Sequence, residues 1–323
     1  MDIIKTDTHI DFMRQRNLAL ILSAIVLLIG VFSLATRGIN FGLDFTGGTL
    51  IEVSYPEAPD LNDLRGALAT AGFDDFTVQT FGSATDIVVR LRGDEDEESN
   101  ADLSTRVLEA LSAEEAAIEL RRVEFVGPQI GQELAEQGGL ALLYVLIGVL
   151  IYISFRFQWR FAVGAVAALI HDVLLVVAVL SILQVSFDLT VVAAILAVIG
   201  YSLNDTIVLY DRLRENFRVK RKGTPPELCN LSINQMLGRT LMTSLTTLLV
   251  LIALFYFGGE IIHAFAFTLI VGVLVGTYSS IYIAGSAAIL LGVSKQDLMP
   301  VQKEGEDEPG VEVLPERFRK GNA

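Results

Sequence analysis

Six long apolar segments separated by shorter polar ones dominate the chain. Each is close to or longer than the roughly 20 residues that an α-helix needs to cross the hydrocarbon core of a membrane. The third segment contains Asp172 and the fourth contains Asp205, whereas the other four carry no charge. The predicted spans are residues 18–35, 139–155, 161–185, 189–210, 240–257 and 264–291. The first is longer than the apolar core of a typical cleavable signal, about 7–15 residues, so we expect an uncleaved anchor.

The segment between the first two spans has the pattern of a separate folded domain. Leu61, Leu64 and Leu68 follow helical spacing after Asp60, a residue type that caps helices. A second amphipathic helix is predicted at 103–111, and alternating or apolar runs predict four strands. The strands are 50–55, 76–81, 87–91 and 118–126. The order β-α-β-β-α-β is that of a split βαβ, ferredoxin-like unit. We therefore predict an α-helical polytopic membrane protein with six transmembrane helices and an extracytoplasmic α+β domain between helices 1 and 2.

Lysine and arginine in the short flanks of the spans predict the orientation. They occur before the first span, between the second and third, and between the fourth and fifth, but are absent from the two short loops on the other side. Because cytoplasmic loops carry such residues in excess, both termini are expected in the cytoplasm. The predicted parts are a cytoplasmic N-terminus (1–17), the first transmembrane helix (18–36), a periplasmic domain (37–137), helices 2–6 with a cytoplasmic loop at 211–239 (138–294), and a disordered cytoplasmic tail (295–323).

Composition sharpens this division of the chain. The 323 residues carry a formal net charge of −14, although 52% of them are hydrophobic. Segment 37–137 holds 21 acidic residues, seven arginines and no lysine, so the whole net charge belongs to the predicted outer domain. An electrostatic nucleic-acid binder is excluded because it needs a basic face. The single Cys229 allows no intrachain disulfide, and three histidines leave little for a metal site.

No motif for ATP binding or common enzyme chemistry is present. The chain lacks a phosphate loop ending in Gly-Lys-Ser/Thr, a GxGxxG after a strand, a GxSxG and an HExxH. We expect no enzymatic activity and no cofactor. Any work that the protein does must draw its energy from a partner or from an ion gradient.

The informative residues are ionisable groups inside the predicted spans. A carboxylate at the centre of a span costs about 2.5–3.5 kcal/mol on insertion scales and suggests a function. Asp205, with Asn204 beside it, and Arg239 lie at comparable depth in neighbouring antiparallel spans. If their separation changes during a cycle, Asp205 takes up and releases a proton; the alternative is a static ion pair. A hydroxyl stripe continues from Arg239, comprising Thr240, Thr243, Ser244 and Thr247.

Two further features of the spans have alternative interpretations. His171 and Asp172 form either a second relay station or a hydrogen bond between helices. Small residues at helical spacing predict close helix packing. They are Ala193, Ala197, Gly200 and Asn204 in the fourth span, and Gly272, Gly276, Ser280, Ala284 and Ala288 in the sixth.

Four motifs resemble those of the SecF family of the bacterial SecD–SecF complex. They are GLDFTGG at 42–48, VGPQIGQEL at 126–134, YSLNDTIVLYDRLREN at 201–216 and NLSINQMLGRTLMTSLTTLL at 230–249. The resemblance extends from the first span to the sixth. It implies half of an RND-superfamily transporter in the bacterial cytoplasmic membrane, completed by six spans of SecD.

The resemblance also implies a function in protein export. Such a complex uses the proton-motive force, with Na⁺ as an open alternative, to drive late steps of preprotein transport through the SecYEG channel after SecA. The implied partners are SecD, SecYEG with SecA, YajC and YidC, the unfolded preprotein and membrane lipid. Asp205 and Arg239 match positions associated with proton movement. The two glycine motifs flank the outer domain and look like the segments that couple it to the spans. The residues implied are Gly42, Asp44, Gly47, Gly48, Gly127, Pro128 and Gly131.

Two rival functions share features of this sequence. A proton-driven RND-type exporter of lipid or small molecules shares the architecture, but such proteins usually carry both six-span halves in one chain. An intramembrane aspartyl protease would use Asp172 and Asp205, but the chain lacks a GxGD motif and places the two residues at different depths.

Overall fold

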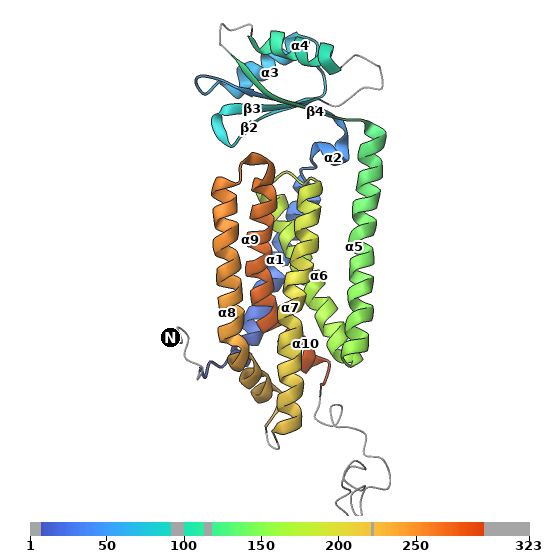
Figure 1. The fold of residues 1–323 in the computed structure, drawn as a ribbon, viewed down its shortest axis with the longest axis vertical. Helices are drawn as coiled ribbons and strands as arrows, with labels where there is room; N and C mark the ends of the chain where they lie inside the picture. Colours follow the sequence, from blue (N-terminus) through green and yellow to red (C-terminus); the bar gives the residue numbers. More distant parts are fainter. Residues whose placement is uncertain (1–7, 92–99, 113–117, 221–222, 294–323) are drawn as a thin grey trace, which may run out of the picture.

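The computed structural model describes residues 8–91, 100–112, 118–220 and 223–293 as a bundle of long helices with a small α+β domain at one end (Figure 1). Six helices are long and apolar enough to cross a membrane, one for each predicted span. They are α1 (Arg16–Arg37), α5 (Pro128–Arg156), α6 (Trp159–Leu183), α7 (Leu189–Val219), α8 (Pro225–Phe257) and α9 (His263–Ser279), which continues through a π-helical segment (Ser280–Ala284) into α10 (Gly285–Leu290). The tail predicted at 295–323 lies outside the described residues.

The segment 211–239, predicted as a loop, is mostly helical. α7 continues to Val219 and α8 begins at Pro225. Thr224 and Glu227 form a capping box at this start, and proline suits the first position of a helix. The loop prediction was therefore wrong, because polar helix turns extend beyond the apolar spans. Likewise α5 begins at Pro128, so the predicted domain border at residue 137 falls within a continuous helix.

α1 and α6 run side by side in parallel, with contacts that recur at a constant separation of 148 residues along the chain. The hydroxyl oxygens of Ser33 and Ser181 lie 3.0 Å apart. A side chain at Gly30 would overlap the Cβ atom of Ala178. The first span therefore packs on the third rather than on the second, which follows it in the chain.

α7 and α9 approach closely through the small residues of the sixth span. A Cβ atom at Gly272 would overlap Val198, and one at Gly276 would lie 3.1 Å from the Cβ of Ser202. The other members of the predicted stripe are also buried. Small residues let helix backbones approach in this way, so the packing prediction for the sixth span is confirmed.

The outer domain has the predicted order of elements. They are β1 (Gly48–Ser54), α3 (Leu61–Thr70), β2 (Phe76–Phe81), β3 (Ser83–Leu91), α4 (Asn100–Ser112) and β4 (Glu119–Val126). The strands pair antiparallel in the order β2-β3-β1-β4, as the ferredoxin-like prediction requires. Asp60 caps α3 by accepting a hydrogen bond from the amide of Asn62 at 2.7 Å.

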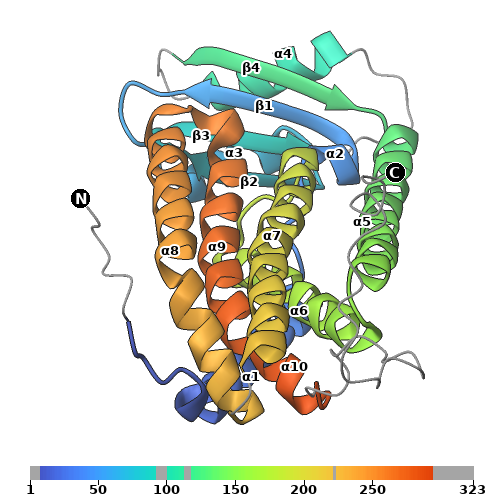
Figure 2. The same ribbon diagram turned by 60° about the horizontal axis from the view of Figure 1, so that its bottom comes forward.

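The two faces of this sheet have different neighbours. Ile51 and Val53 of β1 point into a core shared with α3 and α4, on the side away from the bundle. Leu50 points the other way and packs with Val88 and with Leu43 of α2 (Leu43–Thr46), a single helical turn that the sequence did not predict. Figure 2 shows the sheet lying across the ends of α7, α8 and α9.

The segment before α1 is fastened to the start of α8 by two asparagines. The Asn234 side chain accepts a hydrogen bond from the Ile10 amide at 2.9 Å and donates one to the Ile10 carbonyl at 2.8 Å. Asn230 accepts one from the Met13 amide at 2.9 Å.

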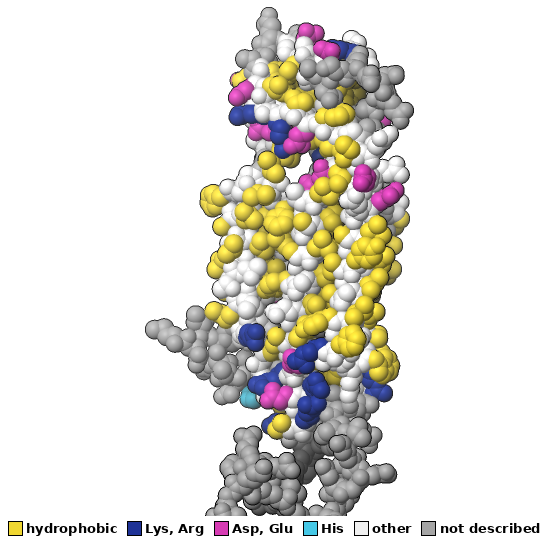
Figure 3. All heavy atoms as spheres, turned by 45° about the vertical axis from the view of Figure 1, so that its right-hand side comes forward, with side chains coloured by type: hydrophobic (Ala, Val, Ile, Leu, Met, Phe, Trp, Pro, Cys, Tyr) yellow, Lys and Arg dark blue, Asp and Glu magenta, His cyan; other side chains and the backbone are white. Residues whose placement is uncertain are grey.

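The surface of the bundle is divided along its length. On the face shown in Figure 3, apolar side chains cover the middle of the bundle, and lysine and arginine gather at the end remote from the domain.

Candidate functional site

Asp205 lies on α7 and is only 4% exposed. Its Oδ2 atom is buried without a hydrogen-bond partner in the described part of the chain, and so is the hydroxyl of Thr206. An ionised carboxyl group in such a place is costly unless a cation or water reaches it. The Asp205 carboxyl group is therefore buried with one oxygen unsatisfied by the described part of the chain.

Arg239, near the middle of α8, is close enough to act electrostatically on Asp205. Its side chain is exposed, and among the described residues it forms no ion pair with Asp205. The static ion pair, one of the two interpretations of these residues, is therefore absent from this conformation. The two groups are near each other but separate.

The small-residue stripe of the fourth span lies on the outside of the bundle. All four of its members, Ala193, Ala197, Gly200 and Asn204, are exposed. A Cβ atom at Gly200 would have no neighbour within 4 Å. The close helix contact that this stripe predicts is thus not made by any described helix of this chain. Asn204, expected beside Asp205 in the relay, points away from the buried side.

A short chain of hydroxyl groups runs between α7, α8 and α9, one turn before Asp205. Tyr201 donates a hydrogen bond to the Ser244 hydroxyl at 3.2 Å, and Ser244 lies 2.7 Å from the Thr277 hydroxyl. Of the predicted hydroxyl stripe, Thr240 and Ser244 are buried, whereas Thr243 faces outward. The stripe therefore contributes in part to the buried polar region around Asp205.

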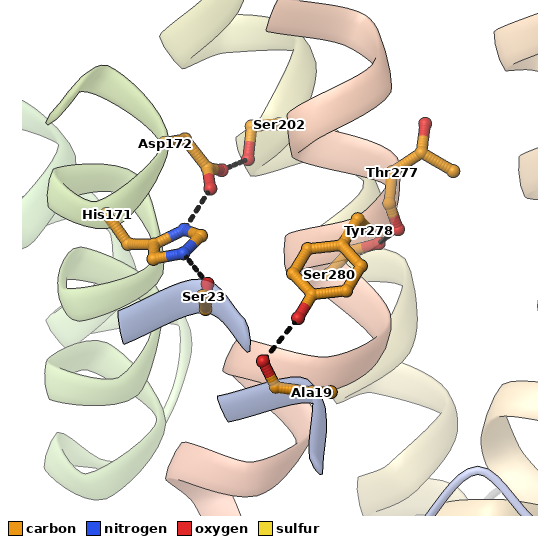
Figure 4. A network of polar contacts seen from close by, with 8 residues as sticks. All are labelled: Ala19, Ser23, His171, Asp172, Ser202, Thr277, Tyr278 and Ser280. Carbon is orange, nitrogen blue, oxygen red and sulfur yellow. Dashed lines mark hydrogen bonds and ion pairs between the residues drawn. The ribbon is translucent and has the colours of Figure 1, made fainter. Parts of the chain in front are cut away.

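His171 and Asp172 join three helices through a buried polar network (Figure 4). His171 Nδ1 lies 2.9 Å from Asp172 Oδ1, and the Ser202 hydroxyl donates to Asp172 Oδ2 at 2.5 Å. His171 Nε2 contacts the hydroxyl of Ser23 on α1. The helix–helix hydrogen bond is confirmed. Sequence reasoning missed Ser23 and Ser202, because a single serine in an apolar span carries no periodic signal.

This geometry also bears on the protease alternative. Both oxygens of Asp172 are engaged, one by His171 and one by Ser202. No hydrogen bond joins Asp172 to Asp205 in the described residues, so the two do not form a carboxyl dyad that shares a proton. Within the same residues, no group of three or more histidine, cysteine, aspartate or glutamate side chains is placed to hold a metal ion.

The GLDFTGG motif forms a junction between the outer domain and α7. The Gly42 amide donates a hydrogen bond to the Phe187 carbonyl at 2.7 Å, just before α7. Asp44 Oδ2 accepts one from the amide of Leu189, the first residue of α7, at 2.9 Å. A carboxylate at a helix N-terminus satisfies a free amide and interacts favourably with the helix dipole. Asp44 thus ties α2, which leads directly into β1, to the helix that carries Asp205.

The glycines of this junction allow a turn and a close approach. Gly47 and Gly48 have φ of 66° and 110°, which only glycine adopts readily, and they turn the chain from α2 into β1. A Cβ atom at Gly131 would lie 3.0 Å from the Gly47 amide nitrogen. Gly127 is the N-cap of α5, and Pro128 is its first residue. The two glycine motifs therefore meet in space, a contact that the sequence did not predict.

Arg90 makes a second connection between the domain and the bundle. Its side chain donates a hydrogen bond from β3 to the Ser186 hydroxyl, at 2.8 Å, in the turn between α6 and α7. Burial lowers the pKa of Arg90, and the charge of Asp188 opposes this change. Asp188 itself caps α7 by accepting from the Val191 amide at 2.9 Å.

Comparisons with known proteins agree over almost the whole chain. Residues 106–294 match the family described as "Protein export membrane protein SecD/SecF, C-terminal", and residues 32–55 match the "SecD/SecF GG Motif". "Protein translocase subunit SecF" of Vibrio alginolyticus is 51% identical over 94% of this chain and 97% of that relative. The protein of the same name from Pseudomonas aeruginosa is 51% identical over 91% of this chain and 95% of its own length.

Solved structures show the same likeness. The crystal structure of SecDF from Thermus thermophilus, described as a translocon-associated membrane protein, superposes with a TM-score of 0.80 at 35% identity. The match covers 89% of this chain but only 39% of the solved one. A structure of SecDF in a "Super-membrane-facing form" matches with a TM-score of 0.63 at 37% identity, again over 39% of that chain.

Proposed function

The chain belongs to the SecD/SecF family of protein-export membrane proteins, and on that premise we propose that it is the SecF-type subunit of a bacterial Sec translocase. Its match covers nearly all of the SecF relatives but only 39% of the longer SecDF chain. A separate SecD-type subunit would supply the remaining part. Together they would act beside the SecYEG channel, after SecA, with YajC and YidC as further partners.

The surface for that partner is the exposed stripe of α7. Ala193, Ala197 and Gly200 leave room for another helix to approach closely. The Gly200→Leu variant should weaken co-purification with a SecD-type subunit in mild detergent. Gly148→Leu is the matched control, because Gly148 on α5 also has open space around it. Equal recovery of the partner with both variants would contradict this assignment.

We place both termini in the cytoplasm and the α+β domain in the periplasm. The support is the gathering of lysine and arginine at the end of the bundle remote from the domain (Figure 3). This orientation leaves the acidic domain where an emerging preprotein passes. Protease added outside spheroplasts should cleave a site inserted into the domain and spare one inserted at the C-terminus; the reverse pattern would refute the orientation.

The membrane half is proposed to carry protons, with Asp205 as the carrier and Arg239 as the movable cation. The observation that carries this proposal is the buried Asp205 carboxyl group, with one oxygen unpartnered and Arg239 near but unbonded. Approach of Arg239 would favour release of the proton, and its withdrawal would favour uptake. Within this chain the buried hydroxyl groups of Thr240 and Ser244 would line the proton path. Asn204, on the exposed side of α7, would line it only from the side facing the partner subunit.

A movement of the helices caused by proton transfer would reach the outer domain along α7. Asp205 lies near the middle of this helix, and Asp44 of the GLDFTGG motif holds its first turn. The Arg90–Ser186 hydrogen bond adds a second connection. A shift of α7 would thereby change the position of the domain and bias an emerging preprotein outward.

The decisive experiment is gradient-dependent preprotein translocation into membrane vesicles. Asp205→Asn should abolish the gradient-dependent part and leave the ATP-dependent part intact. Asp211→Asn is the matched control, since Asp211 lies on the same helix but pairs with Arg156 at the exposed end. Undiminished gradient-dependent transport by Asp205→Asn would refute the relay. Varying Na⁺ at constant pH would identify the coupling ion.

A further inference from the structure

The His171–Asp172 pair is a second buried ionisable cluster, and the relay proposed at Asp205 does not use it. The two side chains are 8% and 1% exposed. Ser202, which binds Asp172, lies on α7 about one helical turn before Asp205. The cluster is thus attached to the helix that carries the proposed relay, although its own residues belong to α6.

We propose that His171 and Asp172 form a second proton-carrying station, whose state is passed to α1 through Ser23. The proposal rests on the proposed relay at Asp205. When the imidazole is neutral, its Nδ1–H donates to Asp172 and its Nε2 accepts the hydroxyl hydrogen of Ser23. When one proton is added at Nε2, both ring nitrogens donate. The charge of the imidazolium is then balanced by the Asp172 carboxylate, and Ser23 must turn its hydrogen elsewhere.

The neighbours of Ser23 supply another acceptor for that hydrogen. The carbonyl of Ala19, one turn earlier on α1, is within the usual reach of a helical serine. This carbonyl already accepts a hydrogen bond from the Tyr278 hydroxyl of α9 at 2.7 Å, and Tyr278 also lies beside Ser23. Proton uptake at His171 would therefore rearrange the polar contact between α1, α6 and α9 (Figure 4).

The surroundings favour such a rearrangement at this point. α9 changes from α-helical to π-helical geometry at Ser280, two residues after Tyr278, and π-helical segments frequently mark functional sites. The groups that contact the pair are Ser23 from α1 and Ser202 from α7. Tyr278 from α9 lies beside Ser23, and Asp205 follows Ser202 by three residues on α7. α5, which also packs on α6, presents apolar side chains. Asp205, about one helical turn beyond Ser202 on α7, is the carboxyl group with which the pair would exchange protons.

The test compares two polar contacts between the same two helices. His171→Gln keeps a side chain that donates and accepts hydrogen bonds but cannot carry a proton. Ser181→Ala removes the uncharged contact with Ser33 and is the matched control. In vesicles that contain the subunit and its SecD-type partner, His171→Gln should lower gradient-dependent translocation about tenfold or more. Ser181→Ala should leave it within about twofold of the parent protein.

Full gradient-dependent transport by His171→Gln would overturn the second station. If Asp205→Asn also retains transport, proton coupling itself fails. If Asp205→Asn loses transport while His171→Gln keeps it, only the present inference fails.

A second measurement does not depend on the folding of His171→Gln. The chain has three histidines, and His9 and His263 are exposed. Replacing both by glutamine leaves His171 as the single ¹⁵N-histidine signal of this subunit in the complex. A ring that carries a proton should show both the neutral and the doubly protonated ¹⁵N pattern as the pH of the sample is varied. A single protonation state throughout would overturn the proposal.

Discussion

Gly272→Ala should destabilise the bundle at the contact between α7 and α9. The added Cβ atom would overlap one methyl group of Val198 and lie 2.8 Å from Cγ1 and 3.0 Å from Cβ. Val198 is 1% exposed, and a β-branched side chain in a helix has essentially one χ1 rotamer. Because Val198 cannot turn away, the two helices must separate or their neighbours must shift.

The size of the effect follows from two opposing contributions. Overpacking of this kind costs about 1–3 kcal/mol, whereas replacing glycine by alanine within a helix gains about 0.5–1 kcal/mol. The net loss in the free energy of unfolding is therefore between about 0 and 2.5 kcal/mol, with a central value of about 1 kcal/mol. Gly200→Ala has the same gain without the clash, because nothing lies within 4 Å of its Cβ position. That variant should be at least as stable as the parent protein.

Thermal unfolding of the purified subunit in mild detergent, followed by circular dichroism, measures this difference. Gly272→Ala should lower Tm by about 2–4 °C for each kcal/mol lost. Adding Val198→Ala makes room for the new methyl group, so the double variant should lose less stability than the sum of the single variants. If Gly272→Ala unfolds at the same temperature as Gly200→Ala, the close packing of α7 on α9 is refuted.

Three further predictions follow from other parts of the chain. Asp44→Ala removes the acceptor for the Leu189 amide, which should cost about 0.5–2 kcal/mol and speed hydrogen exchange of the amides in the first turn of α7. Asp44→Asn keeps an acceptor, so these amides should still exchange slowly. Equal exchange rates in the two variants would contradict the capping role. Hydrogen bonds from Ser54 and Ser83 lower the pKa of Asp86, so they stabilise the fold above the usual carboxyl pKa of about 3.9 and cease to do so as the pH falls through the lowered value. Urea unfolding should therefore show Asp86→Asn as less stable than the parent near pH 7, by under about 1 kcal/mol because the site is exposed, with the difference vanishing in strong acid; a gap that grows on acidification would refute this reasoning. Cys229 is 0% exposed, so a polar maleimide should label it only after denaturation, and rapid labelling of the folded protein would show that the start of α8 is not packed as described.

The sequence predicted the parts of the fold that depend on local pattern. Six apolar runs correctly predicted six long helices. Periodicity, with a helix cap at Asp60, correctly predicted the order of helices and strands in the outer domain. The error at 211–239 came from treating the end of apolarity as the end of the helix. A polar helix that extends beyond the membrane retains its hydrogen bonds, so composition alone does not mark its end.

Contacts between distant residues escaped prediction because they leave no local signal. Ser23 meets His171 across 148 residues, and Asn234 binds Ile10 across 224. The two small-residue stripes illustrate the same limit for surfaces. They look alike in sequence, yet the one containing Gly272 is buried against α7, and the one containing Gly200 is exposed. Pattern predicts that a helix has a close-packing face, but the three-dimensional arrangement decides what covers it.

The parallel pairing of α1 with α6 has a consequence for how the protein is made. Ser23, Gly30 and Ser33 find their partners only after 148 more residues have been synthesised. At about 5–20 residues per second, this takes about 7–30 s. During that time the first span lacks these partners, and its serine hydroxyls can bond to backbone carbonyls of their own helix. The second span leaves the ribosome before the third, so the earliest helix to enter the membrane finds this packing partner only after two more spans have been made.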